Sequence, residues 1–302
     1  MDAAVTAGDA VTFDDRRDAL LVGFDGSPSA AGAIAIASRL LPGRPTRIVH
    51  LWAPPFSSPE LRAALRRRAS TLDELMDLVE QEGRAEAEQT ASAGVALAQA
   101  AELQAQPVVH RSYGGVGLEL ARLAEQPDVA VLAVGSRGLT GVRAVLGSVS
   151  DAAVHYSSVP VLVVPHPLLS AQRGAAATGP VVVGVDGSDC AQRALTTAAS
   201  LFKERRLIAA TAGDVAHTGE IELPVKGDAV TVEPEGVFTS ARAIAAALAR
   251  LAAERGAALI VVGSRGRSAH REILLGSVAM AVLHHAGMPV MVVPRPQRLM
   301  LR

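Results

Sequence analysis

Glycines in this 302-residue chain recur at a spacing suited to holding phosphate. Gly135 and Gly138 directly follow an apolar run, and Gly147-Ser148 comes a short distance later. Because glycine has no Cβ, backbone N–H groups beside it can approach a phosphate closely. If Gly147-Ser148 opens a helix, the helix N-terminus adds free donors and partial positive charge, and the serine adds a hydroxyl donor. The pattern predicts phosphate binding, although glycines at strand-to-helix turns can also serve the turn alone.

The same pattern occurs a second time, because four sequence blocks recur in the same order. The matching blocks are Val22–Ser27 with Val183–Ser188, Val134–Gly138 with Val262–Gly266, Leu146–Val149 with Leu275–Val278, and Pro160–Pro165 with Pro289–Pro294. Such self-similarity indicates a duplicated domain. We therefore predict a first repeat at residues 19–165 and a second repeat at residues 180–302. A linker at 166–179 would join them, and residues 1–18 would form a disordered tail.

The elements that must position these glycines are short apolar strands alternating with Ala-rich helical stretches, which is typical of βαβ units and a buried parallel sheet. The first repeat has expected strands at Ala19–Phe24, Arg47–Trp52, Pro107–Arg111, Val129–Val134 and Val159–Val164. The second has them at Val181–Val185, Leu207–Ala212, Ala229–Glu233, Ala258–Val262 and Pro289–Val293. This predicts an α/β fold with two tandem, doubly wound, five-stranded parallel-sheet domains.

The two repeats differ between their second and third strands. In the first repeat, Leu61–Glu102 reads as a long, heavily charged helix. The second repeat has only residues 213–228 there, and Gly219, Pro224 and Gly227 interrupt them. Glycine and proline disfavour a helix interior. We therefore predict that the second repeat lacks this crossover helix, which would leave one face of its sheet less covered.

Composition narrows the functional classes. With 29 basic and 30 acidic residues and 3% aromatic residues, the chain has neither the charge nor the stacking groups that nucleic-acid binding favours. Its apolar runs are far shorter than the ~20 residues of a membrane-spanning helix, so no membrane contact is expected. One cysteine excludes an internal disulfide and favours a reducing compartment, so we expect a cytoplasmic protein.

Familiar catalytic and metal motifs are not found in the sequence. No lysine accompanies either glycine set as a Walker A loop requires, and the first strand is followed by Gly-Phe-Asp-Gly-Ser rather than GxGxxG. Cys190 falls near the start of a helix, where the helix dipole could make a thiol reactive, but its counterpart in the first repeat, Ser29, is inert. The His284-His285 pair has no carboxylate or cysteine to complete a metal-ligand set. We therefore predict no catalytic residues and no metal ligands.

The order of motifs resembles the universal stress protein family in its tandem two-domain form. Asp-Gly-Ser follows the first strand, then come Gly-Ser-Arg-Gly, a spacer, Gly-Ser-Val and a closing Pro-Val-x-Val-Val. The ATP-binding branch of that family has the pattern G-x2-G-x9-G-[ST]. The second repeat matches it with nine residues between Gly266 and Gly276, whereas the first has eight between Gly138 and Gly147. The implied fold is of the adenine nucleotide alpha hydrolase-like type.

The resemblance implies an ATP site in each repeat, carried over position by position. Residues implied near the ribose and adenine are Phe24, Asp25, Leu51 and Val134 in the first repeat, and Val185, Asp186, Ala210 and Val262 in the second. Residues implied around the phosphates are Gly135, Arg137, Gly138, Gly147, Ser148 and Val149, and in the second repeat Gly263, Arg265, Gly266, Gly276, Ser277 and Val278. Asp25 and Asp186 have an alternative interpretation as N-caps of the following helices.

The implied function is that of an ATP-binding sensor or regulator of the stress response, with ATP bound alone or with Mg²⁺. Two alternatives remain open from the residues: a nucleotide-free interaction module of the same fold, and a slow ATPase. The fifth strands end at Pro165 and Pro294, and as sheet edges they need covering. We expect them to pair between repeats or between chains, with a homodimer through sheet edges and a downstream protein partner that the sequence does not identify.

Overall fold

The computed structural model describes residues 17–54, 59–137, 146–212, 227–234, 240–266 and 275–295. The predicted tail, except Arg17 and Asp18, lies outside these residues, and so does the whole 213–226 connection in which the second repeat was predicted to lack a helix. Within the described part, ten strands form one sheet in the order β3-β2-β1-β4-β5-β10-β9-β6-β7-β8. The α/β fold with two parallel-sheet repeats is confirmed.

The first repeat comprises β1 (Ala19–Gly23), α1 (Pro28–Leu40), β2 (Thr46–Trp52), α2 (Pro59–Arg66), α3 (Leu72–Ala100), β3 (Ala105–Arg111), α4 (Val116–Leu123), β4 (Val129–Gly135), α5 (Ser148–Tyr156) and β5 (Val161–Val164). The connecting segment contains α6 (Ser170–Thr178). The second repeat comprises β6 (Val181–Gly184), α7 (Asp189–Leu201), β7 (Leu207–Ala212), β8 (Gly227–Val232), α8 (Ala241–Glu254), β9 (Leu259–Gly263), α9 (Ser277–His285) and β10 (Val290–Val293). Each of the ten strands overlaps the range predicted for it.

The long helix predicted at Leu61–Glu102 is instead two helices, α2 and α3. The chain leaves helical geometry before Thr71, whose side chain accepts a hydrogen bond from the Glu74 N–H and so caps α3. A threonine hydroxyl at this position satisfies a donor that the helix itself leaves free. The single-helix prediction was therefore wrong in its continuity, because it gave no weight to this cap.

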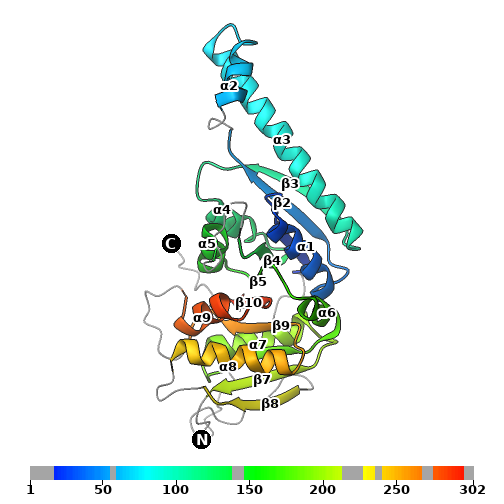
Figure 1. The fold of residues 1–302 in the computed structure, drawn as a ribbon, viewed down its shortest axis with the longest axis vertical. Helices are drawn as coiled ribbons and strands as arrows, with labels where there is room; N and C mark the ends of the chain where they lie inside the picture. The colour runs from blue at the N-terminus through cyan, green and yellow to red at the C-terminus, as the bar shows by residue number, and fades with distance from the viewer. Residues whose placement is uncertain are drawn as a thin grey trace, which may run out of the picture.

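Helices cover both faces of the sheet (Figure 1). One face packs against α1, α3 and α7, and the other against α4, α5, α8 and α9. Strands buried on both faces must be apolar at consecutive positions, and β4, β5 and β10 are buried along nearly their whole length. Each layer of core runs without a break across both repeats, so the two repeats share one apolar interior.

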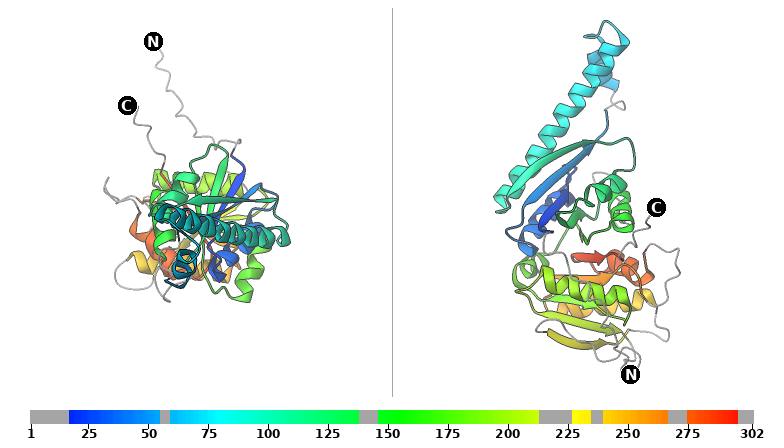
Figure 2. Two further views of the ribbon diagram at one scale, coloured as in Figure 1. Left: turned by 90° about the horizontal axis from the view of Figure 1, so that it is seen from above. Right: turned by 180° about the vertical axis from the view of Figure 1, so that it is seen from behind.

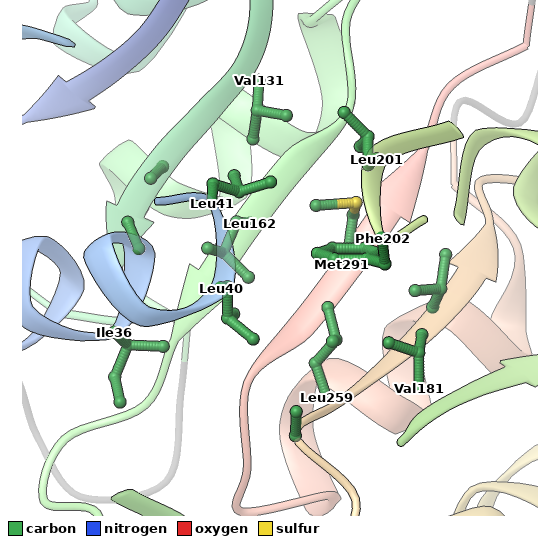
Figure 3. Close-up of a cluster of buried hydrophobic side chains, with 14 of the residues drawn as sticks. Ile36, Leu40, Leu41, Val131, Leu162, Val181, Leu201, Phe202, Leu259 and Met291 are labelled. Carbon is green, nitrogen blue, oxygen red and sulfur yellow. The ribbon is translucent and has the colours of Figure 1, made fainter. Parts of the chain in front are cut away.

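The two repeats meet where β5 pairs with β10, the one antiparallel pairing in the described sheet. Leu162 of β5 lies opposite Met291 of β10 in this register, and both side chains are fully buried. They belong to the same buried cluster as Leu40 and Phe202 (Figure 3). The predicted edge strands therefore pair between repeats, and the outer strands of the sheet are β3 and β8.

The linker between the repeats is held by Arg205, which follows α7. Its guanidinium donates to the carbonyl oxygens of Ala176, Ala177 and Gly179 at the end of α6, and to that of Arg39 near the end of α1. The distances are 2.8 to 3.0 Å. A cation near helix C-termini also compensates the partial negative charge there. One side chain of the second repeat thus joins the linker to the first repeat.

None of the described helices is both long enough and apolar enough to cross a bilayer. The longest, α3, has 29 residues but carries acidic and basic side chains along much of its length.

Candidate functional site

A cavity of about 360 Å³ opens in the first repeat where β1, β2 and β4 end. In open parallel sheets, ligands bind beyond the carboxyl ends of the strands, where the strand order reverses. In this sheet β1 lies between β2 and β4, so the cavity is at that reversal. Its lining residues are Gly23, Phe24, Asp25, Ala30, Val49, Leu51, Val116, Leu120, Val134, Gly135, Arg137, Gly147, Ser148, Val149 and Ser150.

The cavity has an apolar wall and a polar end. The wall consists of aliphatic side chains from β2, α4 and β4, namely Val49, Leu51, Val116, Leu120 and Val134. The polar end consists of the β4–α5 connection and the first turn of α5, with Arg137 and Ser148. This combination of apolar surface with a few convergent polar groups is typical of small-molecule sites.

Gly135 is required at the end of β4 because α1 approaches it closely. A Cβ at this position would lie 2.5 Å from Ser29 Oγ and 2.6 Å from the Ser29 carbonyl carbon. The second repeat has the same arrangement, where a Cβ on Gly263 would lie 2.7 Å from the backbone of Cys190. The glycines at these two positions therefore allow strand-to-helix packing beside the site, in addition to any role in binding.

The N-terminus of α5 faces the polar end without a side-chain cap. Gly147 is the N-cap residue, and no side chain accepts from the first turn. Helix α1, in contrast, is capped by Ser27 Oγ, which accepts from the Ala30 N–H. Ser150 Oγ donates to the Gly135 carbonyl at 2.8 Å and so ties α5 to β4. The α5 amides beside Ser148 thus point to a place where an anion would be stabilised.

Asp25 and Asp186 are not N-caps, so that alternative is wrong. The caps of α1 and α7 are Ser27 and Ser188. Each aspartate instead accepts from a backbone N–H at 3.0 Å, Asp25 from Ser27 and Asp186 from Ser188. These bonds tighten the turn after the first strand of each repeat and hold the Asp25 carboxylate at the cavity.

Arg137 connects the cavity to the start of the linker. Its backbone N–H donates to Ser29 Oγ at 3.3 Å, and its guanidinium donates to the His166 carbonyl at 3.2 Å. A guanidinium that lines the cavity can also donate charge-assisted hydrogen bonds to an anionic ligand.

The structure brings together all the described residues predicted for the first site. Phe24, Asp25, Leu51, Val134, Gly135, Arg137, Gly147, Ser148 and Val149 line the cavity, and Gly138 lies outside the described residues. Most residues of the apolar wall were not predicted from the sequence. The alternation of β2 could have indicated Val49, two residues before Leu51, whereas Val116 and Leu120 depend on how α4 packs, which no local pattern indicates.

The predicted residues of the second site occupy equivalent places. Gly276 is the N-cap of α9 and donates to the Ser264 carbonyl at 2.7 Å, as Gly147 does to Ser136 at 2.8 Å. Val185, Ala210 and Val262 are buried at the ends of β6, β7 and β9. Ser277 and Val278 begin α9, and Arg265 follows β9. A Cβ on Gly266 would lie 2.6 Å from Asp186 Oδ2, so that carboxylate sits beside the glycine turn.

Cys190 and the paired histidines were also singled out from the sequence. Cys190 is buried in the first turn of α7. His284 and His285 end α9, with ring centroids 6.3 Å apart. Across the described residues, no group of three or more His, Cys, Asp or Glu is placed to hold a metal ion.

Comparison with known proteins assigns the family. The sequence profile of the universal stress protein family matches residues 17–165 and again residues 178–294. This chain therefore belongs to the universal stress protein family, with two such domains in tandem. Family membership supports a role in the stress response, and proteins of this family are generally non-enzymatic.

Relatives and solved structures agree with this assignment. A universal stress protein of Mycolicibacterium smegmatis is 32% identical over 186 residues, which cover 55% of this chain and 62% of that protein. The chain thus spans less than two thirds of that relative's length. A universal stress protein of Mycobacterium tuberculosis is 28% identical over 316 residues, covering 92% of this chain and 95% of the relative. The crystal structure of a universal stress protein from Archaeoglobus fulgidus has the same fold, with a TM-score of 0.64 at 19% identity over 94% of this chain and 100% of that chain.

Proposed function

We propose that the cavity of the first repeat binds ATP and that nucleotide occupancy is the signal by which this protein senses or regulates the stress response. The observation that carries the proposal is the order of groups along the cavity. An apolar wall suited to adenine leads to an uncapped helix N-terminus and Arg137, which suit a polyphosphate. The volume of about 360 Å³ falls within the usual range for small-molecule sites, about 300 to 1,000 Å³.

The cavity residues could hold Mg²⁺ only together with the phosphate oxygens of a bound nucleotide. Asp25 is the one carboxylate among the lining residues, and one of its oxygens already accepts from the Ser27 N–H. A magnesium ion usually binds through one or two carboxylates together with phosphate oxygens. Asp25 would hold such an ion, whose chemistry would be to neutralise charge on the phosphates.

The proposal is binding without efficient turnover. Among the described residues that line the cavity there is no lysine or histidine, and the single carboxylate accepts a hydrogen bond from the Ser27 N–H that holds it in a turn. Phosphoryl transfer is accelerated mainly by positioned charge around the transferred group. We expect phosphate release far slower than about 1 s⁻¹, the lower end of ordinary enzyme turnover. A phosphate-release assay at saturating ATP measures this, and faster turnover would contradict a binding role.

Calorimetric titration with ATP of the Ser148→Glu variant tests the binding site. A glutamate at the start of α5 favours the helix, since negative charge stabilises a helix N-terminus, but it repels phosphate at the same place. We expect the affinity of the first site to fall at least about tenfold, equal to about 1.4 kcal/mol. Circular dichroism should remain unchanged.

The matched control is Ser277→Glu, the equivalent position at the start of α9. If only the first repeat binds, this variant leaves the titration unchanged. If both repeats bind, each variant removes one of two equivalents. Wild-type protein that gives no binding heat, or Ser148→Glu protein that binds as the wild type does, would refute the proposal and favour a nucleotide-free interaction module.

A further inference from the structure

The helix α3 extends far beyond the sheet that it covers (Figures 1 and 2). At 1.5 Å per residue its 29 residues span about 44 Å. Its C-terminal half packs on β2, β3 and α1 through small buried residues such as Ala91, Gly94 and Ala98. Its N-terminal half projects with α2 packed against it. We call residues 59–83, which comprise α2, the connection and the first 12 of the 29 residues of α3, the α2–α3 arm.

The α2–α3 arm leaves part of its apolar face exposed. Leu72, Leu75, Met76 and Val79 follow the i, i+3, i+4, i+7 spacing of one helix face. Val79 is buried, as is Leu65 of α2, whereas Leu72 is 72% exposed and Met76 is 47% exposed. An apolar stripe that continues a buried helix face into solvent marks an interaction surface.

Along the chain, basic residues precede this stripe and acidic residues follow its first member. Arg66 ends α2 and Arg67 follows it, and Asp73 and Asp77 lie on the first turns of α3; all four are exposed. Within the described part of the chain, no ion pair engages any of these four side chains, although the neighbouring Arg68 lies 3.7 Å from Glu82. A segment that carries both signs next to exposed apolar residues can pair with a second copy of itself, because a two-fold axis can bring the basic part of one copy against the acidic part of the other.

We propose that the α2–α3 arm is a homodimer contact, in which the arms of two copies of this chain pack together around a two-fold axis. The axis would pass near Leu72 and Met76 and bring the basic segment of each copy against the acidic turn of the other. The self-complementary charge favours a second copy over an unrelated protein. A homodimer was expected through the β5 and β10 edges, but these strands pair with each other within the chain. Dimerisation would therefore need another surface.

Such a dimer would be weak. The exposed apolar residues are few, and interfaces that bury less than about 1,200 Å² in total belong to weak or transient complexes. We expect a concentration-dependent monomer–dimer equilibrium with a dissociation constant in the micromolar range.

Sedimentation equilibrium of the full chain over a concentration series tests the apolar contact. The Leu72→Glu/Met76→Glu variant should be monomeric at every concentration, with an unchanged circular dichroism spectrum. Leu97→Glu is the matched control, because Leu97 lies on the same helix and is 45% exposed but is outside the arm. That variant should dimerise as the wild type does.

A charge exchange tests the identity of the partner. Arg66→Glu/Arg67→Glu and Asp73→Arg/Asp77→Arg should each dimerise at least tenfold more weakly than wild type, because like charges then meet across the axis. Mixed in equal amounts, the two variants should form a heterodimer about as tight as the wild-type dimer.

A wild-type chain that stays monomeric throughout the concentration series overturns the proposal, and so does a dimer that survives Leu72→Glu/Met76→Glu. A mixture of the charge variants that forms no heterodimer also counts against the two-fold arrangement. These results do not depend on nucleotide binding, so failure of the dimer proposal would not affect the proposed ATP site.

Discussion

Replacing Arg205 with methionine is expected to lower the free energy of unfolding by about 3 kcal/mol. Four backbone carbonyls would lose a charged donor, and two of those four hydrogen bonds are partly buried. Hydrogen bonds to charged groups contribute about 1.5 to 3 kcal/mol each where they are shielded from water, and less where water replaces them. Methionine keeps much of the length of the side chain, so the measured loss reports the hydrogen bonds rather than a cavity.

Urea denaturation followed by circular dichroism measures this loss, and the adjacent Arg206 provides the control. Arg206 is 62% exposed and pairs with Asp228 at the surface, so Arg206→Met should cost less than about 1 kcal/mol. Desolvation by burial lowers the pKa of Arg205 but leaves an arginine protonated at neutral pH, so the effect should not change between pH 6 and pH 8. Equal losses in the two variants would show that Arg205 does not hold the linker.

Truncating Leu162 to alanine is expected to destabilise the protein by about 2 to 5 kcal/mol, the range for a leucine removed from a packed core. Leu162 is fully buried at the junction of the repeats, opposite Met291 (Figure 3). Because the core is continuous across this junction, the loss should affect the unfolding of both repeats rather than the first repeat alone. Urea denaturation of the full chain provides the measurement.

A double-mutant cycle with Met291→Ala tests whether the junction couples the repeats. Residues in contact show coupling energies of about 0.5 to 3 kcal/mol, whereas distant and independent sites add. We expect a value of about 1 kcal/mol. Strict additivity, together with two separate unfolding transitions, would mean that the repeats fold as independent units despite their shared sheet.

The sequence predicted the sheet well because its strands are buried on both faces. A strand covered by helices on each side must be apolar without alternation, and runs such as Val129–Val134 and Val181–Val183 are too short to be confused with buried helices. The repeated blocks then marked the first, fourth and fifth strands of both repeats. The pairing of β5 with β10 was predicted only as one of two possibilities, because the sequence does not distinguish an edge covered by its own chain from one covered by another.

The candidate site was predictable in its polar half and only partly, at Leu51 and Val134, in its apolar half. Glycines and serines with a fixed spacing mark the turns around α5, whereas the packing of α4 decides that Val116 and Leu120 face the cavity. The break between α2 and α3 was missed for a related reason. Arg66, Arg67 and Arg68 are good helix formers, and only the capping threonine at position 71 signals a new start.

The junction of β5 with β10 also bears on how the two halves can diverge. In a symmetric pair of separate chains, every substitution occurs on both sides of the axis, so a change that suits one side must be tolerated by the other. Here each repeat has its own sequence, and the two already differ. Ser29 lies against Gly135 in the first repeat, whereas Cys190 occupies the equivalent place against Gly263 in the second. The two glycine loops also differ in length by one residue. Covalent fusion thus allows a substitution in one site that leaves the other site unchanged.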